Sequence, residues 1–267
     1  MPMTYCPLFS GSSGNSALLD AGGARLLIDA GLPGRTVVNA LSAAGYSPES
    51  LQGILITHEH SDHVKGAGVL SRKYDLPIYA NAGTWEAMEG QIGKIAPKNI
   101  RLFDTGHEFF LGKLAVFPFS VPHDAADPVG FSFRCGGTKL SQATDLGHMT
   151  PEVLEAVRES DLLLLESNYD VAMLKAGPYT YALKQRILGN NGHLSNDAAA
   201  LSCVRLLNLG VRRFVLGHLS GENNFEELAF QTCAQALTDA GAHLGEGADA
   251  ALYLAHRDRP AAVFHLE

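Results

Sequence analysis

Residues 54–63 place an apolar run directly before a cluster of four side chains of the kinds that bind metals. In extended backbone, the side chains at i and i+2 point to the same side, so His58 and His60 can converge on one cation. Asp62 and His63 lie just past the predicted strand end and can turn toward a second cation. A lone histidine is usually structural, but this spacing after a buried strand predicts a metal site.

The composition is that of a globular protein. The chain has 267 residues, of which 46% are apolar and 18% charged, and this length can bury a sizeable core. No linker or charge block divides it, so we expect a single domain over residues 1–267. The net charge of −8 disfavours broad, non-specific attraction to nucleic acid, although bound cations can make a local field positive.

The longest apolar runs, such as residues 162–165, are far shorter than the roughly 20 residues of a membrane-spanning helix. The first residues lack the pattern of an export signal, so we expect a cytoplasmic protein without membrane association. The four scattered cysteines form no CxxC pair and favour reduced, buried thiols.

Apolar runs rich in β-branched residues alternate with segments of helical periodicity, which predicts a layered α/β (α+β) architecture. The predicted strands cover residues 16–20, 25–29, 53–57, 77–80, 114–120, 130–134, 139–143, 162–166, 213–217 and 250–255. The predicted helices cover residues 35–44, 67–74, 151–159, 196–209 and 225–240. Thr150 and Ser195 are the expected caps of two of them.

The HxHxDH pattern of residues 58–63 resembles that of the metallo-β-lactamase-fold hydrolases. The resemblance implies a four-layer αβ/βα sandwich with a dinuclear metal site at one edge between two sheets. It also implies three further ligands, each after an apolar strand: His123, Asp145 and His218. One ion would be held by His58, His60 and His123, the other by Asp62, His63 and His218, and Asp145 would be shared between them.

The predicted cofactors are two divalent metal ions, Zn2+ or Mn2+, because imidazole and carboxylate ligands suit both. The iron-binding redox branch of the superfamily usually has Glu where this chain has His60, which favours hydrolysis. Two ions roughly 3.5–4 Å apart would supply a bridging hydroxide at neutral pH and neutralise charge on a phosphate.

Several segments together resemble the YycJ/WalJ group of this superfamily, which is related to the tRNase Z and PhnP phosphodiesterases. They are residues 9–16, 166–170, 183–189, 192–196 and 217–224. The resemblance implies a phosphodiesterase or exonuclease that acts on nucleic acid. The alternatives are a thioester or lactone hydrolase, a phosphodiesterase for small cyclic phosphates, and a non-catalytic scaffold stabilised by metal. Secreted β-lactamases have Cys at the position of Asp145, and the stretch from there to His218 is too short for a β-CASP insertion.

The tRNase Z pattern also implies a Glu after a buried strand and a histidine that is not a metal ligand, here Glu166 and His193. A carboxylate on one imidazole nitrogen would fix the tautomer, so the other nitrogen could protonate the leaving oxygen. Alternatively, His193 caps the helix that begins near Asn196. The predicted catalytic residues are therefore Asp62, His193 and Glu166.

Substrate contacts are predicted at polar residues of the group's segments and at two cations upstream of His193. They are Ser12, Asn15, Asn168, Lys184, Arg186 and Asn223. Lys184 and Arg186 suit a phosphate backbone, although solvated charges on a helix are an equal alternative. The amides of residues 11–14 are further candidates for a phosphate, although Gly/Ser loops are more often plain turns and no P-loop lysine follows. No feature of the sequence predicts an oligomeric state.

Overall fold

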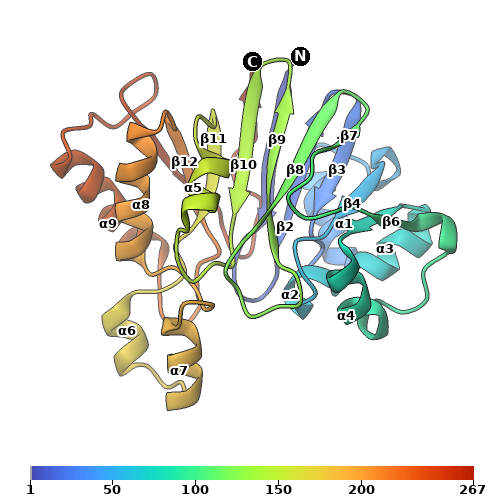
Figure 1. The fold of residues 1–267 in the computed structure, drawn as a ribbon, viewed down its shortest axis with the longest axis horizontal. Coiled ribbons are helices and arrows are strands. Elements are labelled where there is room, and N and C mark those ends of the chain that lie inside the picture. Colours follow the sequence, from blue (N-terminus) through green and yellow to red (C-terminus); the bar gives the residue numbers. More distant parts are fainter. Residues whose placement is uncertain (1) are drawn as a thin grey trace.

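The computed structural model describes residues 2–267 and contains two seven-stranded sheets placed face to face (Figure 1). The first has the order β14-β1-β2-β3-β4-β5-β6 and the second the order β13-β12-β11-β10-β9-β8-β7. The strands are β1 Met3–Phe9, β2 Ser16–Ala21, β3 Ala24–Ile28, β4 Gly53–Leu55, β5 Ile78–Ala80, β6 Ile100–Leu102, β7 Phe109–Leu111, β8 Leu114–Ser120, β9 Val129–Cys135, β10 Thr138–Ala143, β11 Leu162–Glu166, β12 Arg213–Gly217, β13 Ala251–Leu254 and β14 Phe264–Leu266.

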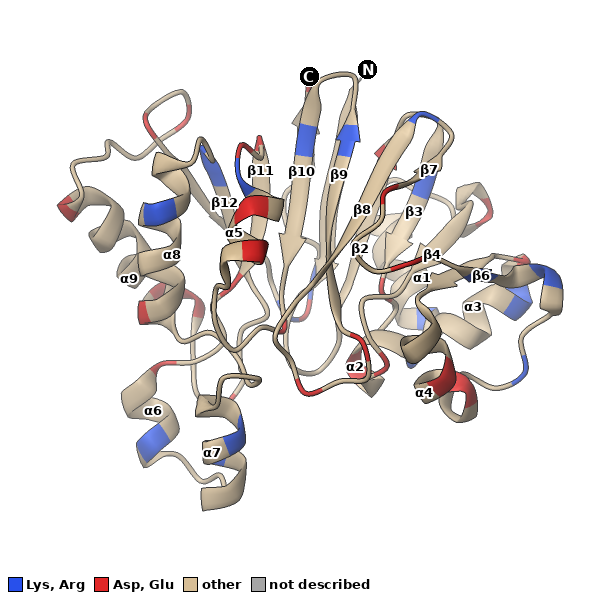
Figure 2. Cartoon of the chain, in the orientation of Figure 1, with Lys and Arg blue, Asp and Glu red and all other residues tan. Residues whose placement is uncertain are grey.

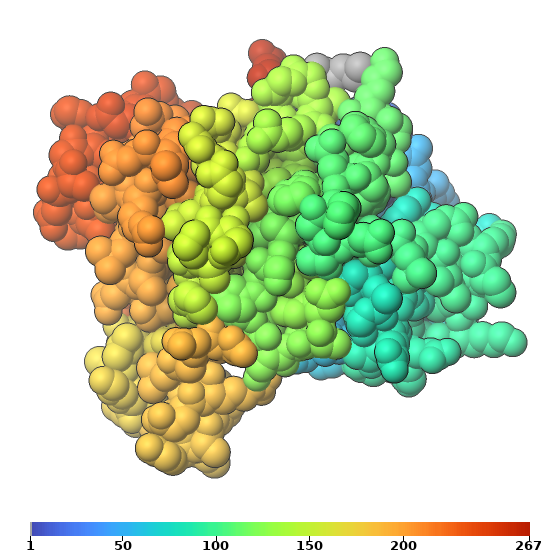
Figure 3. Space-filling model, viewed as in Figure 1, coloured from blue at the N-terminus to red at the C-terminus, as the bar shows by residue number. Residues whose placement is uncertain are grey.

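Helices cover the outer face of each sheet. Those of the first half are α1 Gly34–Ala43, α2 Ser61–Val64, α3 Ala67–Tyr74 and α4 Ala82–Ile92. Those of the second half are α5 Pro151–Val157, α6 Val171–Ala176, α7 Tyr181–Leu188, α8 Asn196–Asn208 and α9 Glu226–Asp239, and two short 3-10 turns span Pro48–Ser50 and Pro97–Asn99. Helices α6 and α7 form an arm that stands out from the body of the molecule (Figure 3).

Three apolar clusters produce the layers. The inner cluster contains Tyr5, Leu19 and Phe131 and fills the space between the sheets, whereas Cys6 and Leu18 belong to the cluster under α1, α3 and α4. Consecutive residues of β1 and β2 thus enter opposite clusters, as the two-residue period of a strand requires. A third cluster joins the second sheet to α5, α8 and α9. The predicted four-layer αβ/βα sandwich is confirmed.

Each sheet has a parallel half and an antiparallel half. Strands β3 to β6 are parallel in the first sheet, and β10 to β13 in the second. Parallel strands end at the same edge, so the loops after β3, β4, β10, β11 and β12 can gather there. This edge lies opposite the one near which both chain ends lie (Figure 1).

All ten predicted strands and five predicted helices are present, with shifts of a few residues at their ends. Thr150 and Ser195 cap α5 and α8 as predicted. The sequence analysis missed β1, because Pro7 weakened its strand signal; Pro7 lies at an irregularity in the pairing with β2. It also missed α7, which buries none of its residues and so has no apolar stripe.

The four cysteines are free and buried, as predicted. Among residues 2–267, no helix has the length and apolar content that crossing a membrane would require.

The sheets are also joined by a buried hydrogen bond, in which the Tyr5 hydroxyl donates to Oε1 of Gln142 at 2.8 Å. We predict that Tyr5→Phe lowers the free energy of unfolding by about 1–3 kcal/mol, because it leaves a buried acceptor without a partner. Urea denaturation measures this loss. The double variant Tyr5→Phe/Gln142→Leu should recover part of it, and an equal or greater loss in the double variant would contradict this interpretation.

Candidate metal centre

The seven predicted ligands lie at the shared edge of the sheets, five of them in loops and two on the short helix α2. His58 and His60 follow β4, Asp62 and His63 lie on α2, His123 follows β8, Asp145 follows β10, and His218 follows β12. Donor atoms within 4.8 Å of one another group as His58, His60 and His123; as Asp62, His63 and His218; and as His58, His63 and Asp145. The first two of these groups correspond to the two ligand sets implied by the sequence resemblance, and the third joins one histidine of each set to Asp145.

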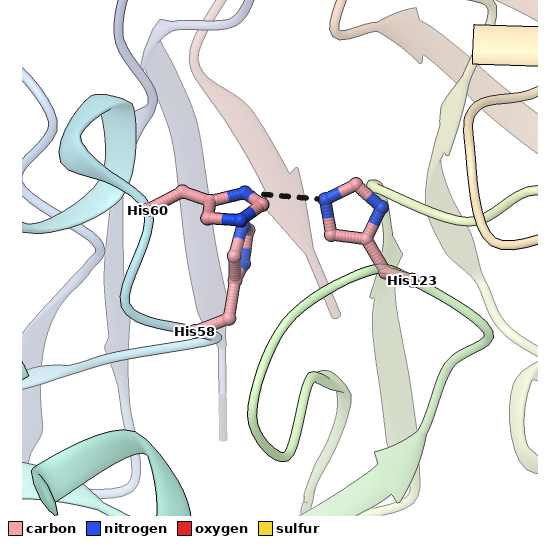
Figure 4. A group of neighbouring side chains, drawn as sticks. All are labelled: His58, His60 and His123. Carbon is pink, nitrogen blue, oxygen red and sulfur yellow. Dashed lines mark hydrogen bonds between the residues drawn. The ribbon is translucent and has the colours of Figure 1, made fainter. Parts of the chain in front are cut away.

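The first group is formed by three imidazoles. Nδ1 of His60 lies 3.3 Å from Nε2 of His123, and the ring of His58 lies 4.7 Å from that of His60. Figure 4 shows that His58 and His60 come from one segment, while His123 approaches from the loop on the opposite side. Three nitrogens converge on one place, as a nitrogen-rich cation site needs.

The second group combines a carboxylate with two imidazoles. Oδ2 of Asp62 lies 3.6 Å from Nε2 of His63 and 3.9 Å from Nε2 of His218. The side chain of Asp62 is 25% exposed, whereas those of His63 and His218 are buried. This group is therefore reached from solvent on the side of Asp62.

The carboxylate of Asp145 lies between the two groups. Its Oδ2 is 3.2 Å from Nε2 of His63, and its Oδ1 is 3.4 Å from Nε2 of His218 and 3.7 Å from Nε2 of His123. Asp145 thus contacts both groups, which is the position that a shared ligand requires.

Three residues of this region have left-handed backbone conformations. The φ angles are 60° at Asp29, 57° at Asp145 and 54° at His218, each within two residues of a strand end. Such a conformation costs about 1–2 kcal/mol for a non-glycine residue, and Asp and His tolerate it better than most. The abrupt turn at each strand end directs these side chains toward the site.

The ring nitrogens that face away from the site are engaged by other groups. Nδ1 of His63 lies 2.8 Å from Oδ2 of Asp29, and Nδ1 of His218 lies 2.8 Å from Oε1 of Glu166. Nδ1 of His123 is 3.1 Å from the carbonyl oxygen of Gly192. Such partners fix the tautomer and leave Nε2 directed toward the site.

The sequence analysis did not find Asp29. It is fully buried, and its carboxylate also accepts hydrogen bonds from the amide and hydroxyl of Thr57. The only signal was an Asp at the end of an apolar strand followed by Ala-Gly, which is common in ordinary turns. Its pairing with His63 depends on the adjacency of β3 and β4.

The buried carboxylates govern the protonation of the imidazoles. Burial lowers the pKa of His63, but Asp145 and Asp29 outweigh it and hold that pKa well above its usual value. Burial likewise opposes the charge on His218, yet Asp145, Asp62 and Glu166 raise its pKa to about 10. For His58 the one nearby carboxylate, Asp145, does not outweigh the opposing effects. Burial, and after it the neighbouring His63, lower the pKa of His58. The second group therefore attracts positive charge strongly.

The side chains fit a divalent cation. Among residues 2–267, the buried atoms Nε2 of His58, Nε2 of His218 and Oδ2 of Asp145 have no hydrogen-bond partner. Buried polar atoms without partners are costly, and metal ligation would satisfy all three. The imidazole and carboxylate donor set is one that divalent first-row metals accept.

The predicted Glu166–His193 pair is present beside the ligands. Nδ1 of His193 lies 2.7 Å from Oε1 of Glu166, and the His193 side chain is 19% exposed. The other oxygen of Glu166 accepts hydrogen bonds from the amides of Leu146 and Leu194. Burial raises the pKa of Glu166, but His193 and His218 outweigh it and hold it below the usual value. Ser195 caps α8, so the alternative of a capping role for His193 is wrong.

Three of the six predicted substrate-binding residues line a cavity of about 160 Å³ next to His193, which we call the terminal pocket. Its lining comprises Ser12, Asp124, Asn168, Tyr179, Leu183, Arg186, Ile187, Gly192, His193 and Ser220. The arm supplies one wall, and α6 and α7 carry Lys and Arg side chains (Figure 2). Arg186 forms an ion pair with Asp124 at the rim.

The other three predicted substrate contacts lie elsewhere. Asn15 is buried, and its side-chain nitrogen Nδ2 lies 3.0 Å from Nε2 of His63, so it contacts a predicted ligand rather than the terminal pocket. Lys184 donates to the carbonyl oxygen of Lys175 within the arm. Asn223 is 1% exposed, and its Oδ1 lies 2.7 Å from where a Cβ of Gly177 would be, beneath the arm. The positions of Lys184 and Asn223 could not be read from the sequence because they depend on how the arm packs.

The loop of residues 11–14 also differs from the expectation of a phosphate-binding turn. The Gly11 amide donates to Oδ1 of Asn15 at 3.0 Å, and the Gly14 amide donates to the carbonyl oxygen of Gly11 at 3.0 Å. Two of the amides expected to bind phosphate are thus used within the loop.

Comparison with known proteins places the chain within a family. Residues 24–219 match the beta-lactamase superfamily domain, and the chain belongs to this superfamily. Within it, the chain belongs to the WalJ/YycJ family. It is 42% identical to the exodeoxyribonuclease WalJ of Streptococcus pneumoniae strain D39, over 93% of both chains, and 39% identical to the exodeoxyribonuclease YycJ of Bacillus anthracis, over 92% of this chain and 93% of that one.

A solved structure supports the fold. The metallo-beta-lactamase fold protein YhfI of Bacillus subtilis superposes with a TM-score of 0.73 over the full length of both chains, at 16% identity. The expected membership of the superfamily and of the YycJ/WalJ group is confirmed.

We predict that Asp29→Asn lowers zinc affinity at one of the two ligand groups by about 10–100-fold, the usual effect of losing a carboxylate behind a metal-binding histidine. Competition with a chromophoric chelator measures this affinity. Asp20→Asn is the matched control, because Asp20 pairs with Arg25 on the surface near the same strands. Wild-type affinity in Asp29→Asn would contradict the positioning role.

Proposed function

We propose that this protein is a metal-dependent phosphodiesterase that degrades nucleic acid from a strand end. The arrangement that carries this proposal is the Glu166–His193 pair between the ligand cluster and the terminal pocket. Two relatives at about 40% identity are named exodeoxyribonucleases, which supports DNA as the substrate. The inner core shared by both sheets supports the interpretation that the chain acts as one domain.

We propose two divalent cations, zinc or manganese, as cofactors. His58, His60 and His123 would hold one, Asp62, His63 and His218 the other, and Asp145 would contact both. When bound, such a pair of cations activates water and neutralises the charge of a phosphate. Asp62 is the most exposed ligand of its group, so it also faces the place where a substrate phosphate would enter.

His193 is positioned to act as the general acid. Its Nδ1 is engaged by Glu166, which leaves Nε2 as the ring atom that can protonate the departing oxygen. The ionised Glu166 stabilises the imidazolium before that transfer, and its second oxygen is fixed by two backbone amides. A proton donor held in this way typically contributes about 10²–10⁴-fold to the rate.

The terminal pocket favours a strand end over continuous duplex. Its volume of about 160 Å³ is bounded by the arm on one side and by Ser12 and Ser220 on another. Ser12, Asn168 and Arg186 offer donors to a phosphate or sugar oxygen. Because Asp124 and Arg186 form an ion pair, the rim has little net charge. Binding of DNA regardless of its base sequence must therefore use other cations.

The proton-donor role gives a prediction that depends on the leaving group. His193→Ala should lower turnover of DNA by about 10²–10⁴-fold, because a nucleoside alkoxide leaves poorly without a proton. Hydrolysis of bis-p-nitrophenyl phosphate should change much less, because nitrophenolate leaves unaided. Metal content should remain that of the wild type, and His243→Ala, at an exposed histidine, is the control. Equal losses with both substrates would overturn this role.

The substrate class is tested by incubating the metal-loaded enzyme with end-labelled single- and double-stranded DNA and RNA. Mononucleotides released progressively from one end of DNA are the expected result, and chelation should abolish it. Brisk turnover of thioesters, lactones or small cyclic phosphates without degradation of polynucleotides would overturn the proposal. Elemental analysis should find two metal equivalents per chain.

A further inference from the structure

A second cavity shares the lining residue Ser220 with the terminal pocket. It has a volume of about 330 Å³ and is lined by Leu219, Ser220, Phe225, Glu226, Arg257, Asp258 and Arg259; we call it the Arg257 groove. Ser220 lines both cavities, so a chain that leaves the terminal pocket over Ser220 enters this groove directly.

Two glycines allow Arg257 to lie in this place. A Cβ at Gly11 would lie 2.7 Å from Cγ of Arg257, and one at Gly221 would lie 2.2 Å from its Nη1. The stem of Arg257 therefore lies against the Gly11 loop, and its guanidinium against the loop that follows His218. A side chain at position 221 would displace the guanidinium, so Gly221 keeps this cation at the border of the site.

Arg257 is also the cation of the groove without a carboxylate partner. Arg259 lies 3.8 Å from Glu226 and 3.4 Å from Asp258, and Glu226 also pairs with His256 at 2.8 Å. Among residues 2–267, no carboxylate oxygen lies within 4.0 Å of the Arg257 guanidinium. It is exposed and free to bind an anion.

An aromatic ring lines the same groove as this cation. Phe225, immediately before α9, is 54% exposed although it is a large apolar residue. Exposed aromatic rings beside a cation are the elements with which proteins bind single-stranded nucleic acid, because bases stack on the ring and phosphates contact the cation. The groove combines both within reach of Ser220.

We propose that the Arg257 groove binds the part of a single DNA strand next to the scissile phosphate, with Arg257 on a backbone phosphate and Phe225 under a base. This proposal rests on the proposed function and deepens it. It defines the substrate as an unpaired strand of several nucleotides rather than a small phosphodiester. The net charge of −8 makes such a local cation necessary, because the protein as a whole repels DNA.

The test compares kcat/KM of the metal-loaded enzyme for a single-stranded DNA decamer, a dinucleotide and bis-p-nitrophenyl phosphate. Arg257→Gln should reduce kcat/KM for the decamer several-fold and make its dependence on the logarithm of salt concentration shallower by about 0.7. Phe225→Ala should reduce it about tenfold through lost stacking. Turnover of the two small substrates should remain that of the wild type.

Two further variants test whether the position of the Arg257 guanidinium matters or only the charge of the protein. Gly221→Ala keeps the charge but displaces the guanidinium, so we expect a loss on the decamer that approaches that of Arg257→Gln. Arg205→Gln removes an exposed arginine from α8, outside both cavities, and should behave as the wild type.

Each failure has a distinct meaning. Unchanged decamer turnover in Arg257→Gln and Phe225→Ala overturns the groove proposal while leaving the phosphodiesterase intact. An equal loss in Arg205→Gln assigns the effect to overall charge and overturns it as well. A wild-type enzyme that degrades no polynucleotide overturns the proposed function itself.

Discussion

Buried negative charge is the constraint on which the rest of the site depends. Asp29, Asp145 and Glu166 have at most 3% of their surface exposed. Burial raises the pKa of Asp145 and Glu166, but the neighbouring histidines outweigh it and hold both values below the usual range. An unpaired buried carboxylate is strongly destabilising, so these three require imidazolium, metal cations or both. The same carboxylates raise the pKa values of His63 and His218, because they favour the charged form of the imidazole.

The fold brings the carboxylates and the imidazoles together through the way its sheets end. Parallel strands of both sheets end at one edge, and left-handed residues there turn the chain abruptly toward the space between the sheets. The carboxylates and imidazoles thus come from segments as far apart as Asp29 and His218, and the three apolar clusters hold these segments in place. The cost of the strained turns is met by packing elsewhere.

The site is open only where a substrate would approach. His60, Asp62 and His193 are the partly exposed members, and the terminal pocket lies beside His193. Ser220 then connects this pocket to the Arg257 groove. The proposed chemistry, end recognition and strand binding therefore fall on adjoining surfaces built mainly from loops, next to the ligands that follow the strand ends.

The sequence by itself determined the strands and helices with clear periodicity and the ligands of the HxHxDH motif, because these signals are local. His123, Asp145, His218, Glu166 and His193 were reached through resemblance to a family, and the structure places all five at the predicted edge. Tertiary structure alone decided the roles of Asp29, Asn15 and Arg257, since each depends on contacts between segments far apart in the chain. The burial of Asn223 and the position of Lys184 follow from the packing of the arm, and no local pattern encodes that packing.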